Sequence, residues 1–198
     1  MSVHLVKNFE NPVQSSQMVF RNILSALSEP GTWQTLPTCE TLPEFEQSTL
    51  SVLFTLLDAD TTLWLSDAKQ TEAVQTNLTF HCGCKITSKQ ADVQFAVYDL
   101  VDFLNDANIS LSMGNDRYPD LSATVILQIP ESEDLTSVVW RGPGIENARE
   151  CHLPLPKAFW DQRQKLIAFP RGIDFILTQG NRVMGLPRST RITVEEKN

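Results

Sequence analysis

Ser122-Ala-Thr-Val-Ile-Leu-Gln-Ile129 is the most strand-prone stretch of the chain. Its β-branched and aliphatic side chains pack well on a pleated surface, which favours a strand. The polar segment Pro130 to Asp134 follows and predicts a turn, and Val138 to Trp140 predicts a second strand. We therefore expect the two strands to pair as a hairpin within a larger sheet.

An amphipathic helix is predicted before this sheet. Asn11 can accept a hydrogen bond from an orphan backbone N–H, and Pro12 suits the first helical position. Apolar residues then recur at helical spacing until about Ser28, and Pro30-Gly31 ends the helix. The face that we expect to be buried carries Val13, Phe20, Ile23, Leu24 and Leu27.

The rest of the chain alternates between strands and helices. The apolar run Ser51 to Leu57, closed by an acidic turn, predicts a strand buried on both faces. Further strands are expected at Thr61 to Leu65, Val93 to Tyr98, Ile173 to Leu177 and Val183 to Leu186, and helices at Asp67 to Leu78 and Pro156 to Ile167. This alternation predicts an α/β fold with a mixed sheet covered by helices.

Length and composition limit the possible functions. A chain of 198 residues with 41% hydrophobic residues suits a single domain over residues 1–198. The net charge of -8 argues against nucleic-acid or anionic membrane partners. Because no apolar stretch is long enough to span a bilayer and no secretory signal is recognisable, we expect a cytoplasmic protein whose four cysteines remain thiols.

Positive charge gathers in the C-terminal third. From Arg141 to Arg191 there are nine Lys or Arg residues against four Asp or Glu. Two motifs here place arginines beside a proline turn, Phe169-Pro170-Arg171-Gly172-Ile173-Asp174 and Leu186-Pro187-Arg188-Ser189-Thr190-Arg191. Guanidinium and hydroxyl groups suit a phosphate or carboxylate. The candidate anion- or partner-binding residues are Arg171, Asp174, Arg188, Thr190 and Arg191; the alternative is an ion pair of Arg171 or Arg188 with Asp174 that fixes a loop.

Other candidate sites are weaker. Zinc could be bound by His81, Cys82, Cys84 and Cys151, but the two-residue spacer that usually separates paired zinc ligands is missing. We therefore expect no metal site. The cysteines are expected to be ordinary thiols, and His81 a structural residue at a strand end. Arg141-Gly142-Pro143-Gly144-Ile145 indicates a turn rather than a phosphate-binding loop. We find no catalytic triad and no lysine in a cofactor-binding context, so the chain by itself looks catalytically bare.

Taken together, the segments resemble the PhnH family, a component of the bacterial carbon-phosphorus lyase core complex of phosphonate catabolism. The resemblance covers nearly the whole chain in order. Besides the two proline-arginine motifs, it is carried by Phe20-Arg21, Ala26-Leu27-Ser28-Glu29-Pro30-Gly31, Ser51-Val52-Leu53-Phe54-Thr55-Leu56-Leu57-Asp58, Trp64-Leu65-Ser66, Phe80-His81, Ala123-Thr124-Val125-Ile126-Leu127-Gln128 and Gly142-Pro143-Gly144-Ile145.

The resemblance implies a cytoplasmic homodimer that assembles with the carbon-phosphorus lyase subunits G, I and J. It also implies a role with subunits G, I and L in forming ribose 1-methylphosphonate 5-triphosphate from ATP and methylphosphonate, without a cofactor of its own. The family fold is similar to that of pyridoxal-phosphate-dependent transferases, a three-layer α/β/α arrangement without the cofactor-binding lysine. No catalytic residue is carried over. The alternatives are a self-sufficient metal-dependent enzyme and a phosphonate- or nucleotide-binding module without turnover.

Overall fold

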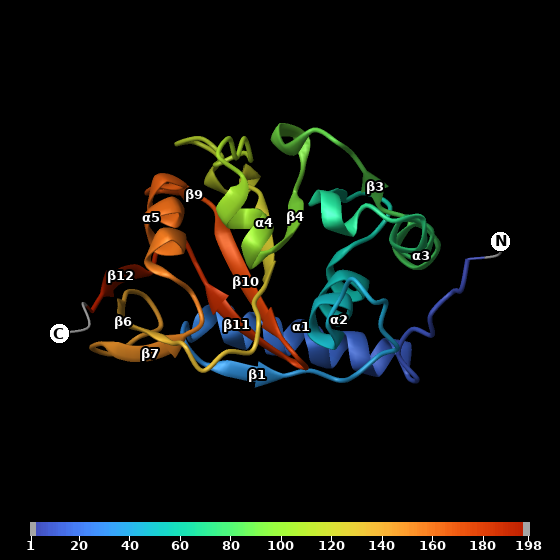
Figure 1. Cartoon of the computed structure of the whole chain (residues 1–198), viewed down its shortest axis with the longest axis horizontal. Helices are drawn as coiled ribbons and strands as arrows, with labels where there is room; N and C mark the ends of the chain where they lie inside the picture. The colour runs from blue at the N-terminus through green and yellow to red at the C-terminus, as the bar shows by residue number, and fades with distance from the viewer. Residues whose placement is uncertain (1–2, 196–198) are drawn as a thin grey trace.

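The computed structural model describes residues 3–195, so the ends of the predicted domain, residues 1–2 and 196–198, lie outside the described part. Its centre is a seven-stranded sheet (Figure 1). In spatial order the strands are β1 (Trp33–Thr35), β11 (Arg182–Leu186), β10 (Asp174–Gln179), β5 (Thr124–Gln128), β4 (Phe95–Asp99), β2 (Thr62–Leu65) and β3 (Lys85–Ile86). The five strands from β10 to β3 are parallel to one another, whereas β11 pairs antiparallel with both of its neighbours, β10 and β1. The predicted α/β fold with a mixed sheet is confirmed.

Helices cover both faces of this sheet. Helices α2 (Gln47–Leu56) and α3 (Glu72–Cys82) lie on one side together with α1 (Pro12–Ser28), and α4 (Leu100–Asn105) and α5 (Lys157–Lys165) lie on the other (Figure 1). Strand β5 contributes side chains to the hydrophobic cores on both faces of the sheet, because successive side chains of a strand point to opposite faces. Val125 and Leu127 pack in the core under α4 and α5, and Ile126 packs in the core under α1 to α3.

A smaller antiparallel sheet packs beside α5. It consists of β12 (Arg191–Val194), β6 (Thr136–Arg141) and β7 (Arg149–Leu153), and a short hairpin joins β8 (Ile167–Ala168) to β9 (Arg171–Gly172). The predicted hairpin of residues 122–129 with 138–140 is therefore wrong. Both edges of β5 are occupied by parallel neighbours, β4 and β10, as is usual for a strand that is apolar on both faces. Strand β6 pairs with β7 and β12 instead.

The predicted strand at Ser51 to Leu57 is also wrong, because residues 51–56 belong to helix α2 and Leu57 is the cap at its C-terminal end. A short apolar run does not distinguish a buried strand from a buried helix. Six consecutive residues of α2, from Ser48 to Leu53, are buried, so the helix has no solvent-facing stripe there to reveal its period. Thr49 ties it to the sheet, since its hydroxyl lies 2.7 Å from that of Thr178 on β10.

The predicted helix from Asp67 to Leu78 is divided in two. Residues Asp67–Lys69 form a single 3-10 turn, η1, and α3 begins at Glu72. Thr71 causes the new start, because its hydroxyl accepts a hydrogen bond from the backbone N–H of Val74 at 3.2 Å. The remaining strands, at 61–65, 93–98, 173–177 and 183–186, and the helix at 156–167 are confirmed within a few residues.

Helix α1 has the predicted limits but buries a different face. Ile23 is buried as expected, together with Val19 and Ala26, whereas Val13, Phe20 and Leu24 are exposed. Asn11 makes no side-chain capping bond. The approach of α1 to the sheet depends on Gly185 of β11, because a Cβ there would lie 2.4 Å from the carbonyl oxygen of Ala26. No helix among the described residues is long and apolar enough to cross a membrane.

Candidate functional site

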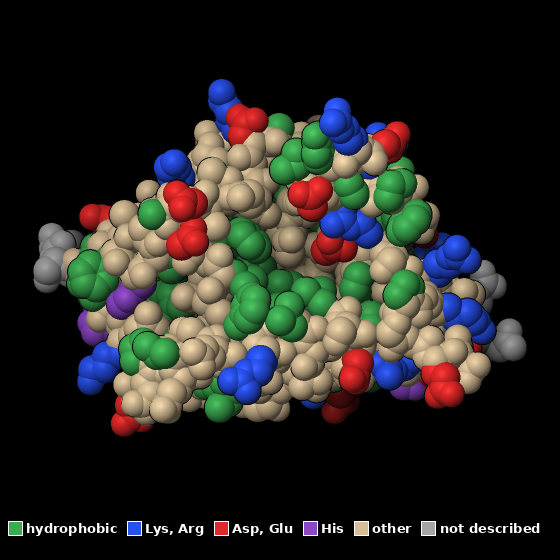
Figure 2. All heavy atoms as spheres, turned by 180° about the vertical axis from the view of Figure 1, so that it is seen from behind, with side chains coloured by type: hydrophobic (Ala, Val, Ile, Leu, Met, Phe, Trp, Pro, Cys, Tyr) green, Lys and Arg blue, Asp and Glu red, His purple; other side chains and the backbone are tan. Residues whose placement is uncertain are grey.

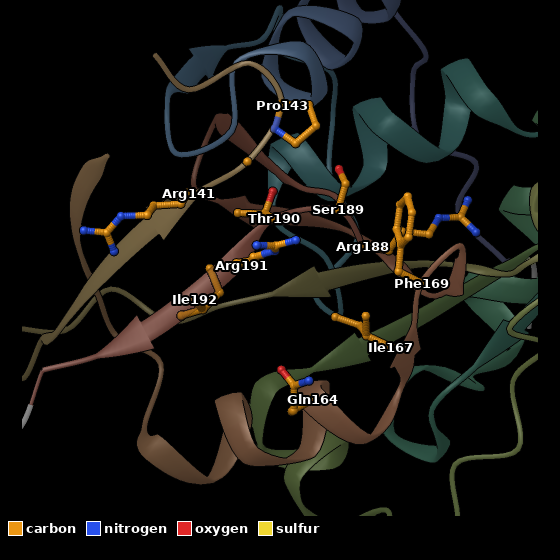
Figure 3. Close-up of a pocket in the computed structure, with 11 residues that line it drawn as sticks. Arg141, Pro143, Gln164, Ile167, Phe169, Arg188, Ser189, Thr190, Arg191 and Ile192 are labelled. Carbon is orange, nitrogen blue, oxygen red and sulfur yellow. The ribbon is translucent and has the colours of Figure 1, made fainter. Parts of the chain in front are cut away.

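The C-terminal motif lines a cavity of about 620 Å³ between the small sheet and the segment that follows α5 (Figure 3). Its floor and walls come from three regions that are far apart in the sequence: the end of β6 with its turn, the end of α5 together with the β8 hairpin, and the loop that leads into β12. The lining residues are Arg141, Gly142, Pro143, Gln164, Ile167, Phe169, Arg188, Ser189, Thr190, Arg191 and Ile192.

Arg163 holds the loop from Pro187 to Thr190 in place. This arginine on α5 is 2% exposed, and its Nη2 donates to the carbonyl oxygens of Pro187 at 2.9 Å and Thr190 at 3.1 Å. Burial of the guanidinium lowers the pKa of Arg163 to about 10, so the group still carries its charge at neutral pH. Nothing in the sequence around Arg163 indicates this role, because the two partners are backbone atoms of a distant loop.

Asp174 fixes Arg188 at the edge of the cavity. One carboxylate oxygen accepts the backbone N–H of Arg188 at 2.7 Å, and the other accepts from its Nη2 at 2.8 Å. A second guanidinium nitrogen of Arg188 donates to the carbonyl oxygen of Pro119. The ion pair considered from the sequence is therefore formed by Arg188 rather than by Arg171, and it coexists with a place in the cavity wall.

The turn after β6 closes the cavity from above in the view of Figure 3. Gly142 has a φ of 150°, and a Cβ on it would lie 2.9 Å from the carbonyl oxygen of Ser189. Only glycine combines this backbone conformation with such a close approach. The turn predicted at Arg141 to Ile145 thus packs directly on the loop that carries Ser189 and Thr190.

Three arginines give the cavity a positive wall. No acidic residue is among its described lining residues, and neither Arg141 nor Arg191 forms an ion pair with any other described residue. Arg191 lies near the centre of the lining, between Thr190 and Ile192, whereas the guanidinium of Arg141 extends outward (Figure 3). Unpaired guanidinium groups beside hydroxyls suit an anion with several oxygens, such as a phosphate or phosphonate.

Thr190 adds an unsatisfied polar group to this wall. Its side chain is buried, and its Oγ1 has no hydrogen-bond partner among the described residues. Buried hydroxyls are almost always hydrogen-bonded, so an unpaired one that lines a cavity favours a ligand or water there. The arrangement can hold an anion by hydrogen bonds, but no described His, Cys, Asp or Glu lines the cavity to serve as a base or nucleophile.

Of the five residues predicted from the sequence, the cavity brings together Arg188, Thr190 and Arg191. Asp174 supports Arg188 from outside the lining. Arg171 lies elsewhere and pairs with Asp116 at 3.1 Å. Arg141, Gln164 and Phe169 line the cavity without having been predicted as site residues. Arg141 begins the turn motif and Phe169 begins the first proline-arginine motif, so both could have been found, whereas nothing local singles out Gln164.

The zinc ligands considered from the sequence are not assembled into one site. Among residues 3–195, no group of three or more His, Cys, Asp or Glu residues could hold a metal ion. His81 lies in α3 rather than at a strand end, and its Nε2 is 2.9 Å from the carbonyl oxygen of Val6. Burial raises the pKa of Cys82 to about 12 and that of Cys151 to about 11, so both remain thiols at neutral pH.

Comparisons with known proteins all identify phosphonate metabolism proteins as similar to this chain. A family model described as bacterial phosphonate metabolism protein (PhnH) matches residues 7–193. The α-D-ribose 1-methylphosphonate 5-triphosphate synthase subunit PhnH of Rhizobium meliloti (strain 1021) is 31% identical over 190 residues, which cover 94% of each chain. HtxG of Stutzerimonas stutzeri, named as a candidate C-P lyase subunit, is 28% identical over 181 residues, 90% of this chain and 86% of its own.

Proposed function

Because the chain belongs to the PhnH family of bacterial phosphonate metabolism proteins, we propose that it is a non-autonomous subunit of the carbon-phosphorus lyase system. Its task in this proposal is the step that forms ribose 1-methylphosphonate 5-triphosphate from ATP and methylphosphonate, with release of adenine. The match over residues 7–193 is the observation that carries the proposal, since it includes every helix and nearly every strand described above.

The cavity supplies a role for the chain within this step. Methylphosphonate and the triphosphate of ATP are multiply charged oxyanions. Arg191 and Thr190 offer them unpaired donors, and Arg141 adds positive charge to the lining. A hydrogen bond between charged partners contributes about 1.5–3 kcal/mol to binding. Because the described lining contains no proton-transferring carboxylate or imidazole, this chain binds and orients an anion while groups from other subunits carry the bond-making chemistry.

The same proposal names the partners. The relatives of this chain are named as subunits of enzymes. We assign the carbon-phosphorus lyase subunits G, I and J as its assembly partners, with subunit L joining them for the synthase step. We also assign the chain itself as a homodimer. Apolar side chains on the outer face of α1 support such contacts: Val13 is 72% exposed, Phe20 47% and Leu24 50%. Hydrophobic side chains also gather in a hollow on the face turned away from the view of Figure 1 (Figure 2). Surfaces of this kind favour burial against another subunit.

We also propose that residues 1–198 form one PhnH-like domain with a three-layer relationship to pyridoxal-phosphate-dependent transferases but without their cofactor site. The mixed sheet with helices on both faces supports this relationship. The one fully buried lysine among the described residues, Lys69, is engaged by the Glu44 carbonyl oxygen at 2.6 Å and by Asp99 at 3.0 Å. These contacts give Lys69 a structural role.

Reconstitution tests the proposed function. The synthase subunits are assembled with and without this chain, and adenine release from ATP in the presence of methylphosphonate is measured by chromatography. We expect release only when the chain is present, and we expect the isolated chain to release none. Equal release without the chain, or turnover by the chain alone, would overturn the proposal.

A further inference from the structure

A second hollow lies where strands β2 and β4 end. It has a volume of about 360 Å³ and is lined by Trp64, Ser66, Asp67, Tyr98, Asp102, Asn105 and Asp106. The carboxyl ends of parallel strands are the usual place for ligands in open α/β sheets. The volume falls within the range of small-molecule sites. None of the residues of the arginine-lined cavity takes part in it.

An aromatic pair forms one wall of this hollow. The rings of Trp64 and Tyr98 have centroids 4.7 Å apart and an interplanar angle of 41°. Tyr98 is fully buried and its hydroxyl donates to Asp106 at 2.8 Å; the same carboxylate oxygen accepts from Gln90 at 2.7 Å. Trp64 is only half-buried, so part of its ring remains available. The hydrogen bond to Asp106 therefore holds the Tyr98 ring in place before any ligand arrives.

The charge of the hollow is opposite to that of the arginine-lined cavity. Three of its described lining residues are aspartates and none is a lysine or arginine. An adjoining hollow shares Trp64 and Asp67 and adds Asp92 with a single lysine, Lys89. Such a surface repels phosphates and phosphonates and attracts cations. Aromatic faces next to carboxylates are the chemistry that recognises organic ammonium and guanidinium groups.

Two buried polar atoms in the hollow lack partners. Ser66 is 2% exposed, and neither its Oγ nor Oδ2 of Asp102 has a hydrogen-bond partner among the described residues. Ser66 directly follows β2, two residues after Trp64, so alternation places its side chain on the same face of the sheet as the Trp64 ring. An unpaired buried hydroxyl and an unpaired carboxylate oxygen indicate that something absent from the chain itself completes the site.

We propose that this hollow binds a small organic cation, with a primary ammonium or guanidinium group directed at Asp102 and Ser66 and the attached carbon chain against Trp64. The three aspartates supply the charge, and the aromatic wall supplies the contact for the alkyl part. The hollow is a site distinct from the anion-binding one.

Titration of the full chain, followed by the indole N–H signal of Trp64 in nitrogen-15 NMR spectra, tests this site. Loss of one signal in Trp64→Phe identifies that resonance. The probes are n-butylammonium and n-butylguanidinium, with n-butanol as the neutral probe of the same chain length and methylphosphonate as the anion. We expect saturable shifts for the two cations with a Kd on the order of 1 mM, and none for the other two probes.

Matched variants locate the charge. Asp102→Asn should weaken cation binding about tenfold, whereas Asp60→Asn, which changes the net charge equally at an exposed turn, should change it less than about twofold. If Asp102→Asn does not fold, Ser66→Ala is the second variant. We expect Ser66→Ala to weaken cation binding a few-fold. Equal shifts with butanol, or equal effects of Asp102→Asn and Asp60→Asn, would overturn the proposal. Tighter binding of capped Gly-Lys-Gly or Gly-Arg-Gly peptides than of the free amines would overturn the assignment to a small molecule.

Discussion

Asp174 holds Arg188 by two bonds at once, one to its backbone N–H at 2.7 Å and one to its guanidinium at 2.8 Å. Both side chains are mostly buried, with exposed fractions of 18% for Arg188 and 23% for Asp174. The pair joins the start of β10 to the loop after β11, and this loop also carries Ser189 and Thr190 of the cavity lining. Arg188 therefore combines a structural and a binding role, which Arg191 does not.

Replacing Arg188 by Ala should affect both roles. The substitution leaves the Asp174 carboxylate without its charged partner, and we expect the free energy of unfolding to fall by about 1–3 kcal/mol. Activity of the reconstituted subunit set should fall by more than tenfold. Denaturant unfolding and adenine release measure the two effects. Asp174→Asn is the matched control, because it removes the same ion pair without removing a guanidinium from the cavity. Wild-type activity and complex yield for Arg188→Ala would remove this residue from the site.

Replacing Arg191 by Ala separates binding from stability. Arg191 is exposed and forms no ion pair with another described residue, so the free energy of unfolding should change by less than about 0.5 kcal/mol. Loss of one charge-assisted hydrogen bond to an anion should lower the affinity for ATP or methylphosphonate about tenfold or more. Calorimetric titration of the assembled complex gives the affinity. Arg171→Ala, which removes an arginine outside the cavity, should leave the affinity unchanged; equal losses for the two variants would argue against a specific site.

The sequence predicts most strands of the sheet, but not which strands pair, and it predicts only part of the cavity lining. The strand at residues 122–129 is recognisable because its side chains are apolar on both faces. Its neighbours in the sheet, β4 and β10, could not be predicted, because both belong to distant parts of the chain. Helix α2 has the sequence pattern of a buried strand because its residues 48–53 are all buried, so no solvent-facing stripe reveals the helical period. For the site, Arg188, Thr190 and Arg191 are close in sequence and could be found together. Gln164 could not, since only the packing of α5 brings it to the cavity. Phe169 begins the other proline-arginine motif, but the motif does not indicate that this residue lines the cavity.

The cysteines should react slowly with alkylating reagents. Burial raises the pKa of Cys82 to about 12, against an ordinary value near 9.0, and it also raises the pKa values of Cys39, Cys84 and Cys151. Only the thiolate reacts, so at pH 8 Cys82 should be labelled by iodoacetamide about a thousandfold more slowly than free cysteine. Mass spectrometry of the native chain measures this rate, and the unfolded chain in denaturant is the control. Rapid labelling of native Cys82 would contradict the raised pKa of this half-buried thiol.

Glu46 should make stability depend on pH in the acid range. Its carboxylate accepts the backbone N–H of Gly180, yet burial, the largest influence, raises its pKa above 4.5, and the nearby Glu131 and Asp99 raise it further. The folded state therefore binds a proton more readily than the unfolded state. The protonated form is the favoured one in the fold, and stability is lost as the pH rises through the folded-state pKa.

Glu46→Gln removes this titration while its amide oxygen can still accept from Gly180. Relative to the unmodified chain, the variant should therefore gain stability as the pH is raised from about 4 to 7. Thermal unfolding at several pH values measures the difference. Glu133→Gln, at an exposed position, is the control and should show no such trend. A difference for Glu46→Gln that stays constant with pH would show that the carboxylate titrates alike in the folded and unfolded chains.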